Sequence, residues 1–309
     1  MKALVTSAAF AALFCGVLPA ADPQLLNLVM PDVKVMADIN VAQARTSPFG
    51  QYVLLQVETQ QLQQLATLTG FDPTKDVNEL LVAGNGAGQH AGLALANGNF
   101  NVAAISGVIA LQKVVTETYH GVTIFENKEK DAGLAFLSNS IAAAGDVTNL
   151  KAAIDRVSAP SILPASLLVE VGQLSAANDA WGLTTVPPSS LKPAAGAPAV
   201  PGVGNGAGNI LGTVQSGSAG IKFGANVVMT AQAQASTAQD ATSIASLIQL
   251  LVNLAQMKAS DEPQVQALAK ALTVSANGAT VNIALTLPSA QFQELLQSKA
   301  GAQHHTHAH

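Results

Sequence analysis

The chain has 309 residues and a formal net charge of −5, and charged residues make up 11% of it, against roughly 25% in an average soluble protein. Because phosphate contacts need clustered Lys or Arg, this balance excludes nucleic-acid binding and disfavours attraction to anionic lipid headgroups. The single cysteine, Cys15, lies in a segment expected to be absent from the mature chain, which excludes disulfides, thiolate catalysis and cysteine-ligated zinc.

Residues 1–20 have the layout of a secretory signal peptide, with a basic start, an apolar run at 3–17 and small residues after it. The run is shorter than the roughly 20 apolar residues of a spanning helix, and no later segment supplies one. Phe14 before Cys15 argues against lipid attachment. We therefore expect cleavage after Ala20 or Ala21, export to the periplasm or the exterior, and no transmembrane segment in the mature chain.

Residues 21–184 predict strands and helices in mixed order, with several hairpins. Apolar residues alternate at 33–39, which predicts a half-buried strand, and Ser47-Pro48 opens a helix that runs to Gly70. The further strands are expected up to Ala83, at 92–98, twice within 114–127 around His120-Gly121, twice within 134–145 around Asn139, and at 166–172. The further helices are expected from Asn101 toward Lys113, after the cap Asp146, and briefly near 174–181.

The second part of the chain begins with a change of composition. Residues 185–220 are rich in Pro, Gly, Ala and Ser and predict an exposed linker or loop. A strand is expected at 221–235, followed by a helix with a Ser236/Gln239 capping box up to about residue 259 and another helix from Asp261. A hairpin with Asn277-Gly278 at its tip and a final helix at 289–300 complete the order.

These elements predict an α+β fold in which a mainly antiparallel sheet packs against helices. The chain is expected to divide into an N-terminal half at 21–184, the linker at 185–220, a C-terminal half at 221–299 and a His-rich tail at 300–309. Strand, helix, two strands and helix occur in that order at 33–113 and again at 221–299, which suggests two similar halves, although no residue-level repeat accompanies them.

Few residues are candidates for catalysis. The glycine runs at 84–88 and 202–208 are expected to be turns, because neither stands between a strand and a helix N-terminus. His90 and His120 lie beside glycines and are expected to be solvated. Glu117 and Glu126 flank the predicted turn at His120-Gly121, where paired carboxylates would suit glycoside hydrolysis, but one Trp and two Tyr give little aromatic platform for a sugar. No catalytic residue is therefore assigned, and hydrolysis ranks third among the functions considered.

Two apolar features have both a structural and a binding interpretation. Trp181 is expected to belong to the core, with a ligand contact as the alternative. The helix that contains 241–257 is expected to pack on the sheet, with a groove for a partner or a lipid as the alternative.

Four of the six histidines lie at the C-terminus, as His304, His305, His307 and His309. Imidazoles suit Zn²⁺, Ni²⁺ and Cu²⁺, but nothing nearby orients these side chains. We expect a solvated tail that binds such ions weakly, and no cofactor.

Four segments, "GFDPTKDVNELLVAG", "YHGVTIF", "GDVTNLKAAI" and "NDAWGLT", resemble in their order a pattern of uncharacterised exported bacterial proteins. The resemblance covers most of the mature chain and implies fold and export, with no activity and no functional residue. The resulting hypothesis is an exported, soluble, non-enzymatic binding or structural protein of the bacterial envelope, with a protein partner or an apolar ligand. The alternative is a periplasmic carrier of an apolar ligand such as a lipid, which a large apolar cavity would favour.

Overall fold

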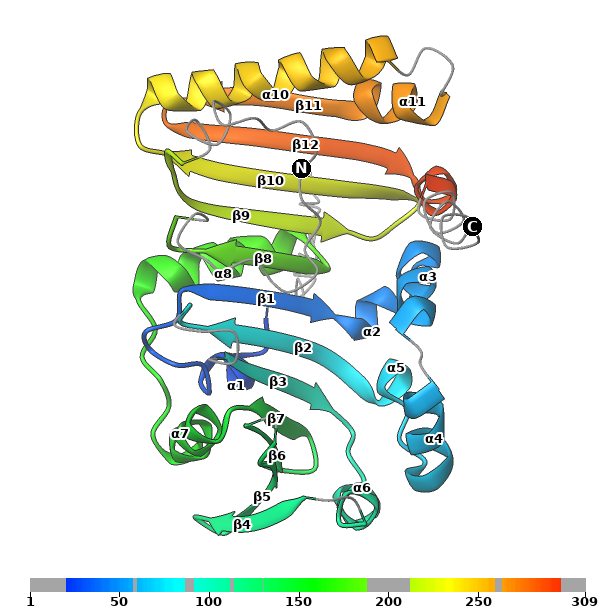
Figure 1. The fold of residues 1–309 in the computed structure, drawn as a ribbon, viewed down its shortest axis with the longest axis vertical. Helices are drawn as coiled ribbons and strands as arrows, with labels where there is room; N and C mark the ends of the chain where they lie inside the picture. Colours follow the sequence, from blue (N-terminus) through cyan, green and yellow to red (C-terminus); the bar gives the residue numbers. More distant parts are fainter. Residues whose placement is uncertain are drawn as a thin grey trace, which may run out of the picture.

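The computed structural model describes residues 21–57, 60–86, 92–111, 114–129, 131–187, 212–258 and 263–295. Their strands form one 12-stranded sheet in the order β11-β12-β10-β9-β8-β1-β2-β3-β7-β6-β5-β4, and every neighbouring pair is antiparallel (Figure 1). This confirms the predicted α+β fold with an antiparallel sheet. The strands are β1 (Val35–Asn40), β2 (Val77–Gly84), β3 (Gly92–Gly98), β4 (Val115–Tyr119), β5 (Val122–Asn127), β6 (Ala132–Phe136), β7 (Ile141–Gly145), β8 (Ala180–Thr184), β9 (Val214–Lys222), β10 (Asn226–Ala235), β11 (Leu272–Asn277) and β12 (Thr280–Pro288).

The helices divide between the two faces of the sheet and the ends of its strands (Figure 1). α1, α7 and α8 cover one face around β3, β6, β7 and β8, whereas α10 and α11 pack on β10, β11 and β12. α2 to α6 lie near the strand ends beside β1, β2 and β3. The helices are α1 (Pro23–Leu26), α2 (Val41–Ala44), α3 (Pro48–Val57), α4 (Gln60–Thr69), α5 (Pro73–Asp76), α6 (Val102–Ile109), α7 (Val147–Ser158), α8 (Ala165–Ala177), α10 (Ala238–Lys258) and α11 (Pro263–Ala271); residues 289–295 are also helical.

The main hydrophobic core lies between the sheet and α1, α7 and α8. Helix α7 forms where the sequence predicted it, because an N-cap and an apolar stripe both specify it. Its residues Leu150, Ala153 and Ile154 recur at helical spacing and are buried, and Asp146 caps its first turn by accepting hydrogen bonds from Asn149 N at 2.9 Å and Asn149 Nδ2 at 2.6 Å. Since the cap and the apolar stripe agree, local sequence alone determines this helix.

Asp146→Ala is expected to lower the free energy of unfolding by about 1 kcal/mol, because it leaves the first turn of α7 without its acceptor. Urea denaturation followed by circular dichroism measures this loss. Glu129→Ala, at an exposed position, serves as the control and should change the stability by less than about 0.5 kcal/mol. Equal values for the two variants would show that the cap is not a significant source of stability.

The segment predicted as a strand at 166–172 is instead the middle of α8, so that prediction was wrong. Leu167, Val171 and Ser175 are buried at a spacing of four residues, whereas Leu168 and Val169 are 44% and 60% exposed. This is helical periodicity, which a short apolar run conceals. The short helix predicted near 174–181 is likewise divided between the end of α8 and strand β8.

The predicted linker at 185–220 was wrong at its C-terminal end, because β9 begins at Val214. The single strand predicted at 221–235 is in fact the end of β9, a turn and β10. β9 is built mainly of small residues and pairs with β8 on one side and with β10 on the other. Tertiary pairing therefore makes a strand from a composition that locally indicates a loop.

The two halves share the order of elements along the chain but differ in the order of strands across the sheet. The first half pairs as β1-β2-β3, whereas the second half pairs as β10-β12-β11. The two halves are therefore not copies of one topology. The cap of α10 is also displaced by one residue from the prediction, since Asp240 N donates to Thr237 Oγ1 at 3.1 Å.

Several predictions lie outside the described residues. These are the leader at 1–20, His90, the last two residues of the glycine run at 84–88, residues 188–211 of the predicted linker with the whole glycine run at 202–208, and the His-rich tail with His304, His305, His307 and His309. None of the described helices is long and apolar enough to cross a membrane.

Candidate functional site

A row of apolar residues crosses one face of the sheet in register. The residues at its centre are small and lie side by side on four neighbouring strands. In order they are Ala37 of β1, Gly182 of β8, Ala219 of β9 and Ala231 of β10. Ala37 and Ala219 are exposed, and none of the described helices covers this part of the sheet. The small side chains leave a hollow above the backbone, and they form the floor of what we call the trough.

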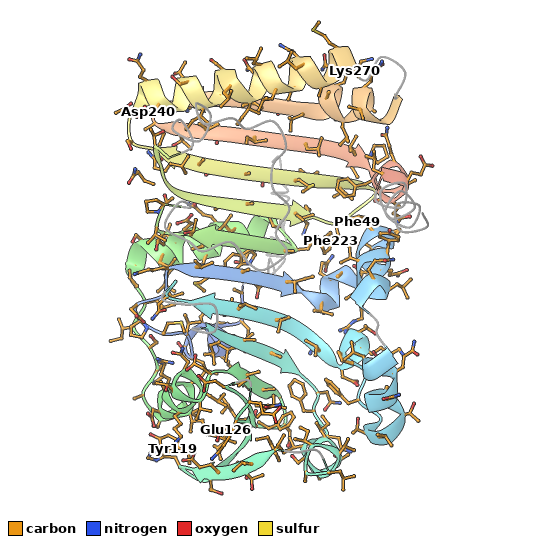
Figure 2. The ribbon with its side chains drawn as sticks, viewed as in Figure 1. Phe49, Tyr119, Glu126, Phe223, Asp240 and Lys270 are labelled. Carbon is orange, nitrogen blue, oxygen red and sulfur yellow. The ribbon has the colours of Figure 1, made fainter. Side chains whose placement is uncertain are left out.

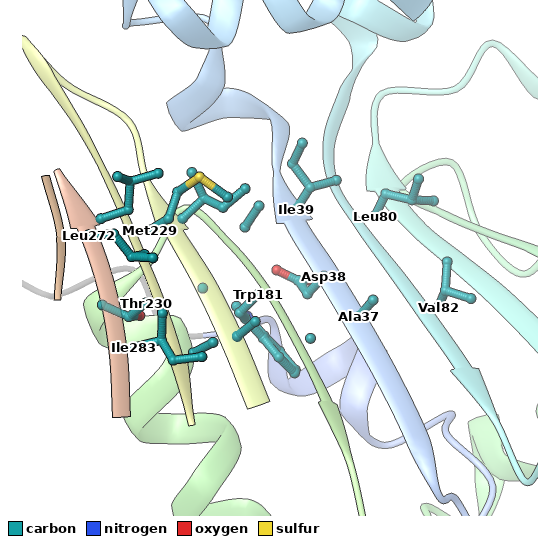
Figure 3. A pocket seen from close by; sticks show the side chains of 17 residues that line it. Ala37, Asp38, Ile39, Leu80, Val82, Trp181, Met229, Thr230, Leu272 and Ile283 are labelled. Carbon is teal, nitrogen blue, oxygen red and sulfur yellow. The ribbon is translucent and has the colours of Figure 1, made fainter. Parts of the chain in front are cut away.

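Larger apolar side chains form the two walls of the trough (Figure 3). On one side stand Ile39, Leu80 and Val82, of which Leu80 and Val82 are 36% and 45% exposed. The other wall is built by Ile221, Met229, Leu272, Ile283 and Leu285. The cavity between them measures about 610 Å³, within the range of roughly 300–1,000 Å³ found for small-molecule sites.

The trough is open because the helices on this face stand at its margins. On β10 to β12, Ile244 and Ala245 of α10 pack with Val281 and Ile283 of β12. At the strand ends, Phe49 of α3 packs against Phe223 at 5.7 Å and, edge to face, against Phe292 at 5.0 Å between ring centroids. Figure 2 shows Phe49 and Phe223 at this end of the sheet. The helices thus frame an uncovered apolar strip.

The chemistry of the trough is that of an apolar surface. Asp38 is the one titratable residue among its described lining residues, and strand alternation places the Asp38 side chain on the opposite face, with Met36 and Trp181. The described lining therefore directs no titratable side chain, oriented nucleophile or cation into the trough. Such a surface can bind an apolar molecule by burying it, but it offers no general acid or base.

The opposite face of β1 and β2 holds two neighbouring carboxyl groups, of buried Asp38 and half-buried Glu79. Burial, together with the nearby charge of Glu79, raises the pKa of Asp38 to about 8. Burial likewise raises the pKa of Glu79. Asp38 Oδ2 and Trp181 Nε1 are buried and have no hydrogen-bond partner among the described residues.

The predicted catalytic candidates do not form a site. Glu117 pairs with Lys151 at 2.7 Å and lies opposite Ile124, whereas Glu126 lies opposite Val115. His120 is two-thirds exposed at the tip of the β4–β5 hairpin, 3.6 Å from Asp155. Figure 2 places Glu126 in this same outer part of the sheet, far along it from the trough. Among the described residues no group of three His, Cys, Asp or Glu could hold a metal ion.

The alternation in β1 predicts the strand but not which of its sides is buried. The residues predicted to share one side are Val33, Val35, Ala37 and Ile39, and those on the other side are Lys34, Met36 and Asp38. In the structure Ala37 is exposed, and the other side, with Met36 and Asp38, is the buried one. Trp181 is 4% exposed and belongs to the core, as predicted.

Comparison with known proteins gives a fold without a family. The sequence matches no protein-family profile and no curated protein. Among solved structures it is similar to three crystal forms of TP0453. Form III gives a TM-score of 0.57 at 12% identity over 90% of this chain and 99% of that chain. Form I gives a TM-score of 0.52 at 11% identity and covers 90% of this chain and 98% of that chain. Form IV gives a TM-score of 0.52 at 9% identity and covers 88% of this chain and 95% of that chain. At these identities the likeness concerns the fold alone.

Proposed function

We propose that the protein is a non-catalytic carrier that binds the hydrocarbon chain of a lipid in the trough. The observation that supports this is the in-register apolar strip across β11, β12, β10, β9, β8, β1 and β2, left open by the described helices on its face. Six gaps between strands at about 4.8 Å make the strip about 29 Å wide across the sheet. A bilayer core is roughly 30 Å thick, so one leaflet's chain spans about 15 Å, which fits within the strip.

The neutral lining selects for a chain rather than a headgroup. Since the described lining residues place no charged side chain in the trough, binding energy should come from burial of CH₂ groups, at about 0.8 kcal/mol for each group. This corresponds to about a fourfold gain in affinity per added CH₂. The predicted export of the chain would give such a carrier its place of action in the bacterial envelope or outside the cell.

The proposal is tested by titrating the purified protein with saturated fatty acids of 8 to 16 carbons, in competition with a fluorescent polyene fatty acid. Affinity should rise about fourfold per CH₂ until the trough is filled, and then level off. A fatty alcohol of the same length should have a dissociation constant within about threefold of that of the acid, because no charged side chain of the described lining contacts the headgroup. Native mass spectrometry of protein purified from its own host should show a retained lipid.

Two results would contradict the carrier proposal. An affinity that does not depend on chain length, or no displacement of the probe, would reject the carrier. A dimer that forms through the trough would instead appear as concentration-dependent association in sedimentation, and the fatty acids would not dissociate it.

A further inference from the structure

The carboxyl groups of buried Asp38 and half-buried Glu79 line a small cavity on the helix-covered face of the sheet. The cavity is also lined by Ala21, Asn40, Ser175, Asn178 and Trp181. Asp38 is 7% exposed, and its Oδ2 atom has no hydrogen-bond partner among the described residues. Among the described lining residues, Asp38 and Glu79 are the two titratable side chains, and neither faces a Lys, Arg or His. Burial raises the pKa of Asp38 to about 8, so the two acids can both be ionised at neutral pH only if a positive group joins them.

The start of the described chain is anchored at this cavity. Ala21 is 6% exposed and belongs to the main core, so its methyl group is a built-in part of the fold. The next residue, Asp22, donates a hydrogen bond from its backbone N to Glu79 Oε1 at 2.8 Å. Its carboxylate accepts from Asn97 Nδ2 at 2.6 Å and from Gln24 N at 2.8 Å, which caps α1. These contacts hold the backbone at 21–22 beside the two acids.

The predicted leader ends at this place in the sequence. Cleavage after Ala20 adds water across the Ala20–Ala21 peptide bond, which leaves a carboxylate on Ala20 and an ammonium group on Ala21. We propose that the Asp38–Glu79 cavity binds the α-ammonium group of Ala21 that leader removal creates. The acids then receive their cation only in the processed chain, so processing itself completes the core. This inference rests on the predicted leader and is independent of the trough, which lies on the other face of the sheet.

The proposal predicts that the stability of the unprocessed chain depends more strongly on pH than that of the processed chain. The charged groups around the cavity are Asp38, Glu79, Asp22 and, after processing, the α-ammonium. Without the ammonium, the pKa of Asp38 is about 8 in the folded chain and near 3.8 in the unfolded chain. Between these values the folded state binds more protons, so stability falls as the pH rises from 4 toward 8. With the ammonium in place both carboxylates are paired, and this fall should largely disappear.

The test compares two chains that differ only at the N-terminus. One begins at Ala21, released from a fusion by a protease that leaves no extra residue, and the other carries Gly-Ser before Ala21. At pH 8 the Ala21 chain should melt at least about 4 °C higher than the extended chain, and at pH 5 the difference should be small. Asp38→Asn/Glu79→Gln should remove the difference at pH 8, whereas Glu129→Gln, an exposed control, should keep it.

A chemical readout separates this role from a general effect of the extension. In the Ala21 chain, the α-amine should react with an amine-reactive ester at least tenfold more slowly than in the Asp38→Asn/Glu79→Gln chain. Equal melting temperatures at pH 8, equal reactivity, or an exported protein that begins at a residue other than Ala21 would overturn the proposal. Fatty-acid titration should give the same result for the Asp38→Asn/Glu79→Gln chain as for the parent, so failure of either proposal is distinguishable from failure of the other.

Discussion

Ala219→Phe is expected to raise the dissociation constant of a 14-carbon fatty acid by at least tenfold. Ala219 lies in the middle of the trough floor, between Gly182 and Ala231, and its own side chain is exposed. A phenyl ring there occupies the volume that the chain would take, while the open face gives the ring room without disturbing the backbone. Loss of several buried CH₂ groups accounts for the size of the effect. Competition with the fluorescent fatty acid measures it.

Thr286→Phe is the matched control for this variant. Thr286 is exposed on β12, and strand alternation places it on the face opposite Leu285 and the trough. It adds the same ring to the same sheet and should leave the dissociation constant within about twofold of the parent. Equal binding by both variants and the parent would remove the trough as the binding site.

Asp179→Ala is expected to lower the free energy of unfolding by about 3 kcal/mol, because two charge-assisted hydrogen bonds are lost and a buried N–H is left without an acceptor. The Asp179 side chain is fully buried and accepts hydrogen bonds from Phe223 N at 2.6 Å and from Lys222 Nζ at 2.5 Å. The alanine removes both acceptors and leaves the Phe223 N–H without its partner. Because these bonds connect β8 to the β9–β10 hairpin, they join the two halves of the sheet. Urea denaturation measures the loss, and amide exchange in β9 should become faster.

Lys222→Met provides the comparison. The Lys222 side chain is 41% exposed, and its removal leaves Asp179 bonded to Phe223 N, so the loss should be about 1 kcal/mol. The double variant then gives the coupling between the two side chains. A loss below about 1 kcal/mol for Asp179→Ala would show that the backbone pairing of β8 and β9 holds the sheet without this side chain.

Much of the fold could be predicted from local signals. The tips at His120-Gly121 and at Gly278 have positive φ angles of 48°, 81° and 56°, which is why their turn residues were informative. α8 and β9 could not be predicted in this way. α8 hides its four-residue spacing in a short apolar run, and β9 depends on pairing with strands on both sides.

The trough was beyond local prediction for a different reason. Its lining residues come from strands between Ala37 and Leu285, and only the register of seven neighbouring strands brings them into one strip. Local alternation indicates that a strand has an apolar side, but it does not say whether helices cover that side. Here they cover the side with Asp38, whose burial the sequence gave no reason to expect.

The small residues of the trough floor have a consequence for how this fold can change over generations. Ala37 and Ala219 face open space, and a Cβ added at Gly182 would approach Met36 O only to 3.5 Å, an ordinary contact. Larger residues could therefore arise at these positions without loss of the fold. Selection for stability alone would not keep these residues small. If they stay small in related proteins, that conservation would therefore reflect selection for binding in the trough. Replacement of these residues by Val, Leu or Phe would indicate lineages that have lost the ligand but kept the fold.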